Sequence, residues 1–194
     1  MNHEEFFRHQ PVTEKLFWDA CTVATPCRVL ELGSKIHNGG GLHRKRGLRL
    51  NHRAEWTGVD IESGPGVDVV ADAHDLESHF PAASFDLACA FSTFEHLARP
   101  WIVAEQLFHV VRPGGLLVVT THQTFPYHPY PQDFFRFSTF GLCEVLKAAG
   151  WRIIEACHQF PCRVVPLENY FTHAHDWNFS SEAWLNVSAF AERA

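Results

Sequence analysis

Two short stretches decide the fold: Arg28-Val29-Leu30-Glu31-Leu32-Gly33-Ser34 and, about one βα unit later, Gly58-Val59-Asp60-Ile61. The first is an apolar run that carries an acidic residue and ends at a glycine, and the second is an apolar run that meets an aspartate. This pairing is typical of a parallel sheet whose first turn lets a ligand approach the backbone, while the second strand offers a carboxylate to a ribose. We therefore expect a nucleoside-containing cofactor.

The composition indicates a globular protein. The 194 residues, 46% of them hydrophobic, fit one domain over residues 1–194 with a helical N-terminal segment at 1–26. The net charge of −6 does not favour a polyanion, so we expect no nucleic-acid partner. We expect no membrane contact either, because no apolar run approaches the ~20 residues that a span requires. Six cysteines without a Cys-x-x-Cys pair favour a reduced, cytoplasmic location, and the sequence gives no oligomeric state.

Hydrophobic patterning predicts alternating strands and helices. Strands are expected over residues 28–33, 55–61, 67–72, 85–91, 116–121, 151–157 and 184–191. Helices are expected over 11–21, from Pro100 through Val111 until Pro113-Gly114-Gly115 stops it, and from the N-cap Ser138 to Gly150. This order predicts an α/β three-layer sandwich with a mostly parallel seven-stranded sheet and an antiparallel last strand.

Six short motifs follow one another along the chain. They are Glu31-Leu32-Gly33, Gly58-Val59-Asp60, Ala71-Asp72-Ala73, Phe85-Asp86-Leu87, Phe94-Glu95-His96 and Arg112-Pro113-Gly114-Gly115. Their order and spacing resemble a class I S-adenosylmethionine-dependent methyltransferase, close to the type 11 methyltransferase family. The resemblance implies a Rossmann-like methyltransferase fold, S-adenosyl-L-methionine as the cofactor and methyl transfer as the activity.

The resemblance also implies a role for individual residues at the cofactor. Glu31 would position the ammonium group, and Gly33, which has no Cβ, would let the methionine end lie close to the chain. Asp60 would accept from the ribose hydroxyls and Asp72 from the adenine amino group. The implied cofactor set is Glu31, Gly33, Ser34, Asp60, Ile61, Asp72, Ala73, Phe91 and Ser92.

The first loop departs from the family pattern. Lys35 stands where the family usually has the second glycine of Gly-x-Gly, and Gly39-Gly40-Gly41 follows later in a long loop. The later glycines could substitute for the second glycine of the family pattern. Alternatively, the chain is a degenerate cofactor-binding module without transferase activity.

Residues 123–137 form a proline-pinned, aromatic segment after the carboxyl end of a predicted strand, which is the side where such sheets bind ligands. We expect this segment to be the substrate side of the site, with Tyr127, Asp133 and Arg136 as contacts. The type 11 group carries a similar His-x-x-Pro-x-Asp-Phe/Tyr-x-Arg-Phe pattern.

Three interpretations of the polar groups in and near this segment remain open. In the first, Asp133 and Arg136 form an internal ion pair that fixes the loop. In the second, His128 or His122, or His96 after the fourth strand, accepts a proton from an attacking hydroxyl, while Arg136 holds an anionic group. In the third, His122, His128 and Asp133 hold a metal, and we do not adopt it: no metal ligand is assigned.

Methyl transfer to a small molecule, such as a hydroxylated metabolite or a sugar, is the predicted function. A nicotinamide-dependent oxidoreductase is disfavoured because Gly-x-Gly-x-x-Gly is missing after the first strand. A nucleic-acid amino-methyltransferase is disfavoured because Ser92-Thr93-Phe94-Glu95 replaces the Asp/Asn-Pro-Pro-aromatic motif that such enzymes share.

Overall fold

A computed structural model describes residues 12–23, 27–36, 51–165 and 182–194, and the structural statements below concern these residues. They contain a seven-stranded sheet in the order β3-β2-β1-β4-β5-β7-β6. Its strands are β1 (Arg28–Leu32), β2 (Glu55–Asp60), β3 (Val69–Val70), β4 (Phe85–Phe91), β5 (Val111–His122), β6 (Trp151–Cys162) and β7 (Ala183–Arg193). β1 to β5 pair in parallel, and β7 runs antiparallel to both β5 and β6. The predicted sheet is confirmed, with its last strand inserted between β5 and β6.

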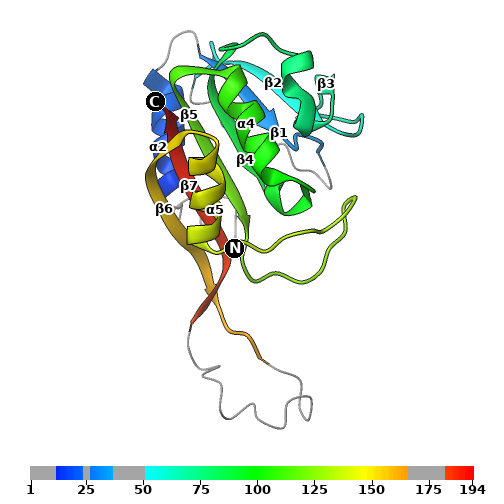
Figure 1. The fold of residues 1–194 in the computed structure, drawn as a ribbon, viewed down its shortest axis with the longest axis vertical. Helices are drawn as coiled ribbons and strands as arrows, with labels where there is room; N and C mark the ends of the chain where they lie inside the picture. Colours follow the sequence, from blue (N-terminus) through cyan, green and yellow to red (C-terminus); the bar gives the residue numbers. More distant parts are fainter. Residues whose placement is uncertain (1–11, 24–26, 37–50, 166–181) are drawn as a thin grey trace.

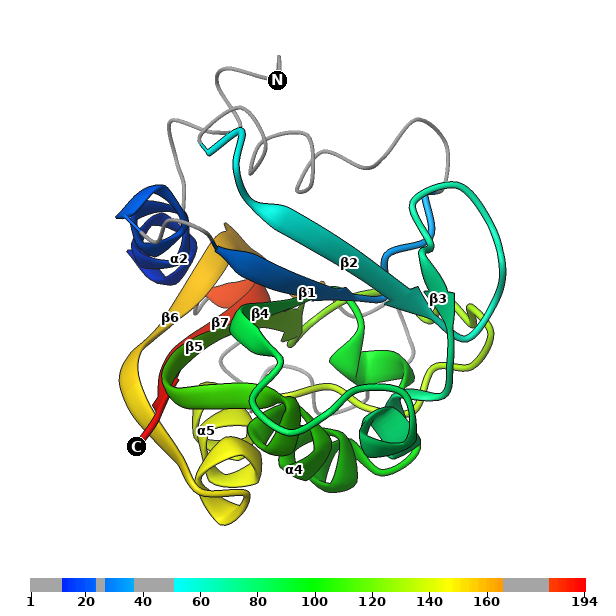
Figure 2. The same cartoon turned by 90° about the horizontal axis from the view of Figure 1, so that it is seen from above.

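Helices cover both faces of this sheet (Figures 1 and 2). Helix α2 (Val12–Val23) lies on one face, and α4 (Pro100–Val110) and α5 (Thr139–Ala148) lie on the other. Two short 3₁₀ helices, η1 (Ala73–Ser78) and η2 (Phe94–His96), follow β3 and β4. Ser138 caps α5 as predicted, because its Oγ accepts from the Gly141 amide at 3.0 Å. The three-layer sandwich is therefore confirmed.

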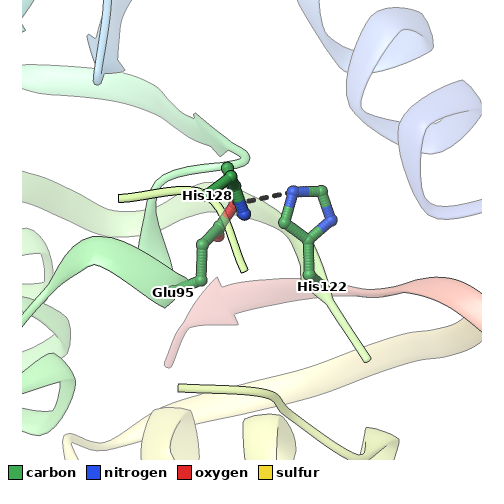
Figure 3. Close-up of side chains that lie close together, drawn as sticks. All are labelled: Glu95, His122 and His128. Carbon is green, nitrogen blue, oxygen red and sulfur yellow. Dashed lines mark ion pairs between the residues drawn. The ribbon is translucent and has the colours of Figure 1, made fainter. Parts of the chain in front are cut away.

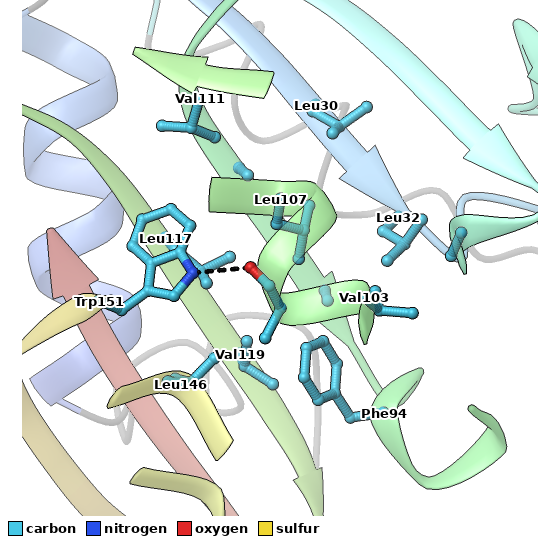
Figure 4. Packing of buried hydrophobic residues seen from close by; sticks show 14 of the residues in the cluster. Leu30, Leu32, Phe94, Val103, Leu107, Val111, Leu117, Val119, Leu146 and Trp151 are labelled. Carbon is cyan, nitrogen blue, oxygen red and sulfur yellow. Dashed lines mark hydrogen bonds between the residues drawn. The ribbon is translucent and has the colours of Figure 1, made fainter. Parts of the chain in front are cut away.

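The alternation of side chains along β4 divides the core between the two faces. Ala88 and Ala90 join the apolar cluster beneath α4 and α5, while Leu87 and Cys89 join the cluster beneath α2. In the larger cluster, the Trp151 ring nitrogen donates to the Ala104 carbonyl at 3.0 Å (Figure 4). This bond gives a buried polar atom its partner and joins β6 to α4.

The end of helix α4 differs from the prediction. The helix stops at Val110, and Val111 already pairs with Phe85 as the first residue of β5. Pro113-Gly114-Gly115 lies inside the strand, where the register shifts between Phe85 and Leu87. Gly114 has a φ of +69°, which suits a glycine in a bulge. The turn-like composition thus marks a bulged strand and not the end of the helix.

Other boundaries shift by smaller amounts. β6 continues to Cys162 beyond the predicted end at residue 157, and β3 is confined to Val69–Val70. The predicted Gly39-Gly40-Gly41 substitution lies outside the described residues, as does residue 11 of the first predicted helix. None of the helices in the described part of the chain is long and apolar enough to cross a membrane.

Candidate functional site

One cavity of about 820 Å³ lies at the carboxyl ends of the parallel strands, within the usual size range of small-molecule sites. Its walls come from the turns after β1, β2, β3 and β4 and from the segment after β5. The predicted residues that line it are Gly33, Asp60, Ile61, Asp72, Ala73, Ser92, His96, His122 and His128. Residues expected at the cofactor and residues expected at the acceptor therefore face the same space.

Asp60 stands at the carboxyl end of β2 and faces the cavity. Its Oδ2 accepts from the Lys35 amide at 3.0 Å, and its Oδ1 accepts from the Glu62 amide at 3.1 Å. Each carboxylate oxygen has two acceptor positions, so both oxygens keep capacity for a ribose hydroxyl. The two amides hold the carboxylate in place for that contact.

Gly33 follows β1 with a φ of +71°, a conformation that favours glycine. A Cβ at this position would lie 2.3 Å from Thr93 Oγ1. The glycine is thus required by its backbone conformation and by Thr93, in addition to any ligand. Ser92, which also lines the cavity, has a φ of +50°, which is uncommon for a residue other than glycine.

Asp72 has a structural role in addition to the predicted contact with the adenine amino group. Its Oδ1 accepts from the His74 amide at 2.9 Å and so caps η1. The same oxygen lies 2.6 Å from His74 Nδ1, and His74 Nε2 accepts from the Arg99 amide at 3.2 Å. Burial raises the pKa of Asp72, but these bonds outweigh it and hold the pKa below its ordinary value, which favours the acceptor form.

Three residues of the predicted cofactor set do not line the cavity. Phe91 shares the β4 face of Leu87 and Cys89, and its ring packs against Phe17 and Trp18 of α2, with ring centres 6.4 and 6.2 Å away. Glu31 and Ser34 are buried. Strand alternation, which the sequence comparison with the family does not resolve, explains the placement of Phe91.

Lys35 lines the cavity at the position of the missing second glycine. Its Nζ lies 2.5 Å from Glu62 Oε2 and 3.5 Å from the Tyr130 hydroxyl. The lysine therefore links the turn after β1 with the segment after β5, and its charge is balanced by a neighbouring carboxylate.

The predicted substrate residues divide between two roles. Arg136 and Asp133 form a two-pronged ion pair at 2.5 and 2.7 Å, and the Asp133 side chain is 1% exposed. The Arg136 guanidinium holds the pKa of Asp133 well below its ordinary value. Neither residue lines the cavity, so the internal ion pair is the arrangement observed. Tyr127 is 76% exposed and does not line the cavity, whereas Tyr130 does.

The segment after β5 is attached to η2 by main-chain bonds. The Phe134 amide donates to the Glu95 carbonyl at 2.8 Å, and the Phe137 amide donates to the His122 carbonyl at 2.9 Å. Asp133 Oδ2 accepts from the His128 amide at 2.9 Å. These bonds fix the position of His128 over η2.

Glu95 is the centre of a cluster that the sequence did not single out. It is fully buried, and its Oε2 accepts from Thr121 Oγ1 at 2.7 Å. Its Oε1 lies 3.0 Å from His122 Nε2, 3.8 Å from His96 Nε2 and 4.0 Å from His128 Nε2. Figure 3 shows Glu95, His122 and His128 pointing toward one another. The signal was available: Glu95-His96 follows β4 and Thr121-His122 ends β5, and these parallel neighbours end at the same edge of the sheet.

The environment of His122 favours a neutral ring. Burial lowers the pKa of its imidazole below the ordinary value of 6.5, an effect that outweighs the opposite influence of Glu95. A neutral imidazole can accept a proton or bind a metal ion. His122 is thus suited to chemistry at neutral pH.

Comparison with known proteins agrees with this geometry. Residues 39–119 match the family described as a methyltransferase domain. The fold resembles an S-adenosylmethionine-dependent methyltransferase from Archaeoglobus fulgidus, with a TM-score of 0.65 and 14% identity over 98% of this chain and 100% of that one. It also resembles such an enzyme from Mesorhizobium loti, with a TM-score of 0.61 and 16% identity over 94% and 98%.

Residues 39–119 therefore resemble a methyltransferase domain, and the fold is that of the class I S-adenosylmethionine-dependent methyltransferases. The class takes S-adenosylmethionine as its cofactor, as the sequence motifs predicted. The structure of the [4+2]-cyclase SpnF is similar to this chain as well, with a TM-score of 0.61 and 17% identity over 92% of this chain and 79% of that one. At such identities the likeness establishes the fold, and the reaction has to be argued from the site.

Two curated relatives match the sequence of this chain. The 27-O-demethylrifamycin SV methyltransferase of Amycolatopsis mediterranei is 28% identical over 155 residues, which are 78% of this chain and 48% of the relative. An uncharacterised methyltransferase of a Mycobacterium species is 27% identical over 113 residues, which are 53% of this chain and 42% of the relative. The chain thus spans about half the length of these relatives.

Proposed function

We propose that the chain transfers the methyl group of S-adenosylmethionine to a hydroxyl group of a small molecule. The observation that carries the proposal is that six of the nine predicted cofactor residues and a cluster of three histidines line one cavity. The relative from Amycolatopsis mediterranei supports an oxygen acceptor, because its name describes a methyltransferase for a 27-O-demethyl compound. A hydroxylated metabolite or a sugar is the substrate class we propose.

The cofactor would lie across the ends of β1, β2 and β3. Asp60 accepts from the ribose hydroxyls, and Asp72 with the Ala73 amide holds the adenine. Gly33 and Ser92 line the same cavity as the histidines, which supports a cofactor whose sulfonium and methyl group face the acceptor side. The protein contributes chiefly by aligning the acceptor oxygen with the methyl carbon.

A hydroxyl acceptor needs a base, because it is a weak nucleophile while it keeps its proton. The histidine cluster supplies it: His96, His122 and His128 each turn Nε2 toward Glu95 beside the cavity. Glu95 stabilises the imidazolium that forms when one of these rings takes the proton. Arg136 and Asp133 hold the segment that carries His128, which is a positioning role and not a contact with the acceptor.

A second candidate is a cofactor-binding module without transferase activity. Lys35 favours it, since a side chain occupies part of the cavity wall where the family usually has glycine. Separate measurements of cofactor binding and turnover distinguish the two candidates, because a module of this kind binds the cofactor and releases no S-adenosylhomocysteine from S-adenosylmethionine.

Calorimetric titration with S-adenosylhomocysteine tests the cofactor assignment. Asp60→Ala removes the partner of the ribose hydroxyls and should weaken binding by about 1–3 kcal/mol, roughly tenfold to a hundredfold. Asp75→Ala is the matched control, because Asp75 is exposed, bonds to Ser78 and does not line the cavity. Equal affinities of wild type and Asp60→Ala would contradict the assignment.

Turnover is then measured with a panel of hydroxylated small molecules, through the release of S-adenosylhomocysteine and the mass of the methylated product. Methylation at oxygen supports the proposal. Methylation at nitrogen or carbon would overturn the acceptor class while leaving the cofactor site intact.

A further inference from the structure

Four acceptor atoms converge on one point beside the cavity. Glu95 Oε1 lies at the centre, and the Nε2 atoms of His122, His96 and His128 surround it at 3.0, 3.8 and 4.0 Å. For the triad of Glu95, His122 and His128, one ligand atom from each residue lies within 4.8 Å of the other two. The three side chains come from η2, the end of β5 and the segment after β5, and Figure 3 shows them meeting.

The hydrogen bonds on the far side of each ring decide what Nε2 presents. Nδ1 of His96 lies 2.6 Å from the Gln132 carbonyl, and Nδ1 of His128 lies 3.0 Å from the Pro126 carbonyl. A carbonyl oxygen only accepts, so each Nδ1 carries the proton, and Nε2 of the neutral ring presents a lone pair. Nδ1 of His122 lies 2.7 Å from Asn186 Oδ1 in the same arrangement. Histidines that bind metals typically donate their other ring nitrogen in this way.

The buried carboxylate of Glu95 is energetically unfavourable at this point unless a cation binds among the four atoms. Its Oε2 is held by Thr121, whereas its Oε1, which is buried, accepts no hydrogen bond of normal geometry from any side chain in the described ranges. A buried carboxylate oxygen among imidazole lone pairs is unfavourable without a positive partner. Arg136 does not supply one by contact, since its guanidinium donates to Asp133 and to the carbonyls of Phe125, Pro126 and Phe135.

We propose that Glu95, His122 and His128 bind one divalent transition-metal ion. Two imidazole nitrogens and one carboxylate oxygen suit zinc and the neighbouring first-row metals, whereas magnesium and calcium prefer oxygen alone. Ligand atoms around a tetrahedral zinc lie about 3.3 Å apart, given metal–ligand distances of about 2.0–2.1 Å. The observed 3.0 and 4.0 Å separations from Glu95 Oε1 need only small side-chain movements to reach that value.

Three protein ligands leave a position open, as in catalytic zinc sites. Because His122 and His128 line the cavity, this position faces the acceptor side. Resting on the proposed function, an ion held by these residues would bind the acceptor hydroxyl and lower its pKa. The hydroxyl proton passes to His96 Nε2, an oxygen lone pair forms the bond to the methyl carbon, and the electron pair of the broken carbon–sulfur bond stays on sulfur as S-adenosylhomocysteine.

The test is a calorimetric titration of chelator-treated, dialysed protein with zinc chloride. The wild type should bind one zinc ion per chain with high affinity. Glu95→Gln, His122→Ala and His128→Ala should each weaken that binding at least about a hundredfold, since even an outer partner of a metal ligand typically contributes 10–100-fold. His79→Ala is the matched control, because His79 is exposed and contacts Phe80 away from the cluster. Its affinity should equal that of the wild type.

Two further measurements distinguish a variant that fails to fold from one that loses the metal site, and loss of the metal site from loss of the cofactor site. Circular dichroism without metal checks that each variant folds, and Glu95→Gln preserves the shape of the side chain if the alanine variants do not. Equal zinc affinity in wild type and the three variants, or no binding by folded wild type, would overturn the metal site. S-adenosylhomocysteine binding, measured independently of zinc, tests the cofactor site, so failure of the proposed function is visible apart from failure of the metal site.

Discussion

The two ends of the cavity are built by different means. On the side proposed for the cofactor, Asp60 and Asp72 bond to main-chain amides of the next few residues or of an adjacent turn, so each carboxylate stabilises local backbone. On the acceptor side, Glu95, the histidines and the Asp133–Arg136 pair bond to one another across η2, β5 and the segment after it. We therefore expect the loss of one member on the proposed cofactor side to have a local effect, whereas one loss on the proposed acceptor side should affect several groups.

The largest effect is expected on the acceptor side. His122→Ala removes a member of the Glu95 cluster, which is proposed to take the acceptor proton or to hold the metal ion. It should lower the rate of methyl transfer by about 100- to 10,000-fold, the usual range for acid–base catalysis, and leave the affinity for S-adenosylhomocysteine unchanged. Release of S-adenosylhomocysteine under saturating cofactor measures the rate, with His79→Ala as the control. A parallel loss of cofactor affinity would show that the two ends do not act separately.

Arg136→Ala should have the next largest effect, on stability. The substitution leaves the Asp133 carboxylate, which is 1% exposed, without its cation, and breaking a buried pair typically costs about 3–5 kcal/mol. For a chain of this length the melting temperature should fall by on the order of 10 °C. Thermal unfolding by circular dichroism measures it. A melting temperature like that of the wild type would mean that the pair does not hold the segment.

These two expectations bear on what the sequence could predict. The ion pair of Asp133 and Arg136 was one of the open interpretations, and the two residues stand three positions apart in the sequence. Glu95 was not predicted as a site residue, since its partners His122 and His128 come from elements that meet only in the folded chain. Contacts between residues that are close in the sequence can be predicted from their spacing. Contacts between residues of different elements depend on how the sheet brings those elements together.

The fold itself was largely predictable. Apolar runs that end in Gly33, Asp60 and Asp72 mark strands with their carboxyl ends at one edge, and the structure places all three residues at the cavity. Phe91 shows a limit of this prediction. The end of a strand determines where along the sheet a residue lies, but the alternation of side chains determines which face of the sheet it joins. Pro113-Gly114-Gly115 shows another, since turn-forming residues also build bulges.

On the cofactor side, Asp72→Ala should produce a smaller, mixed effect. It removes the cap of η1, which costs about 1 kcal/mol of stability, and it removes the predicted partner of the adenine amino group. For Asp72→Ala, the melting temperature and the S-adenosylhomocysteine affinity should therefore both fall. For Asp60→Ala, the affinity alone should fall. A loss of stability with full affinity would assign Asp72 to the cap alone.

The smallest effect is expected far from the cavity, at Asp86. Burial raises the pKa of Asp86, but bonds from the Arg28 amide and the Arg112 side chain outweigh it and hold the pKa below its ordinary 3.8. A lowered pKa stabilises the folded chain above the ordinary value, and this contribution disappears as the pH falls through the lowered one. Asp86→Asn should thus be less stable than wild type at pH 7, and the difference in denaturant midpoint should shrink below about pH 4. A difference that stays constant across this range would exclude the ionised carboxylate as its source.

A crystal structure of the protein with S-adenosylhomocysteine tests the division of the cavity most directly. We expect the ribose hydroxyls within hydrogen-bond distance of Asp60, the adenine beside Asp72, and the sulfur facing the space in front of His96, His122 and His128. A cofactor bound elsewhere, or one whose sulfur points away from the histidines, would contradict a single cavity with a cofactor end and an acceptor end.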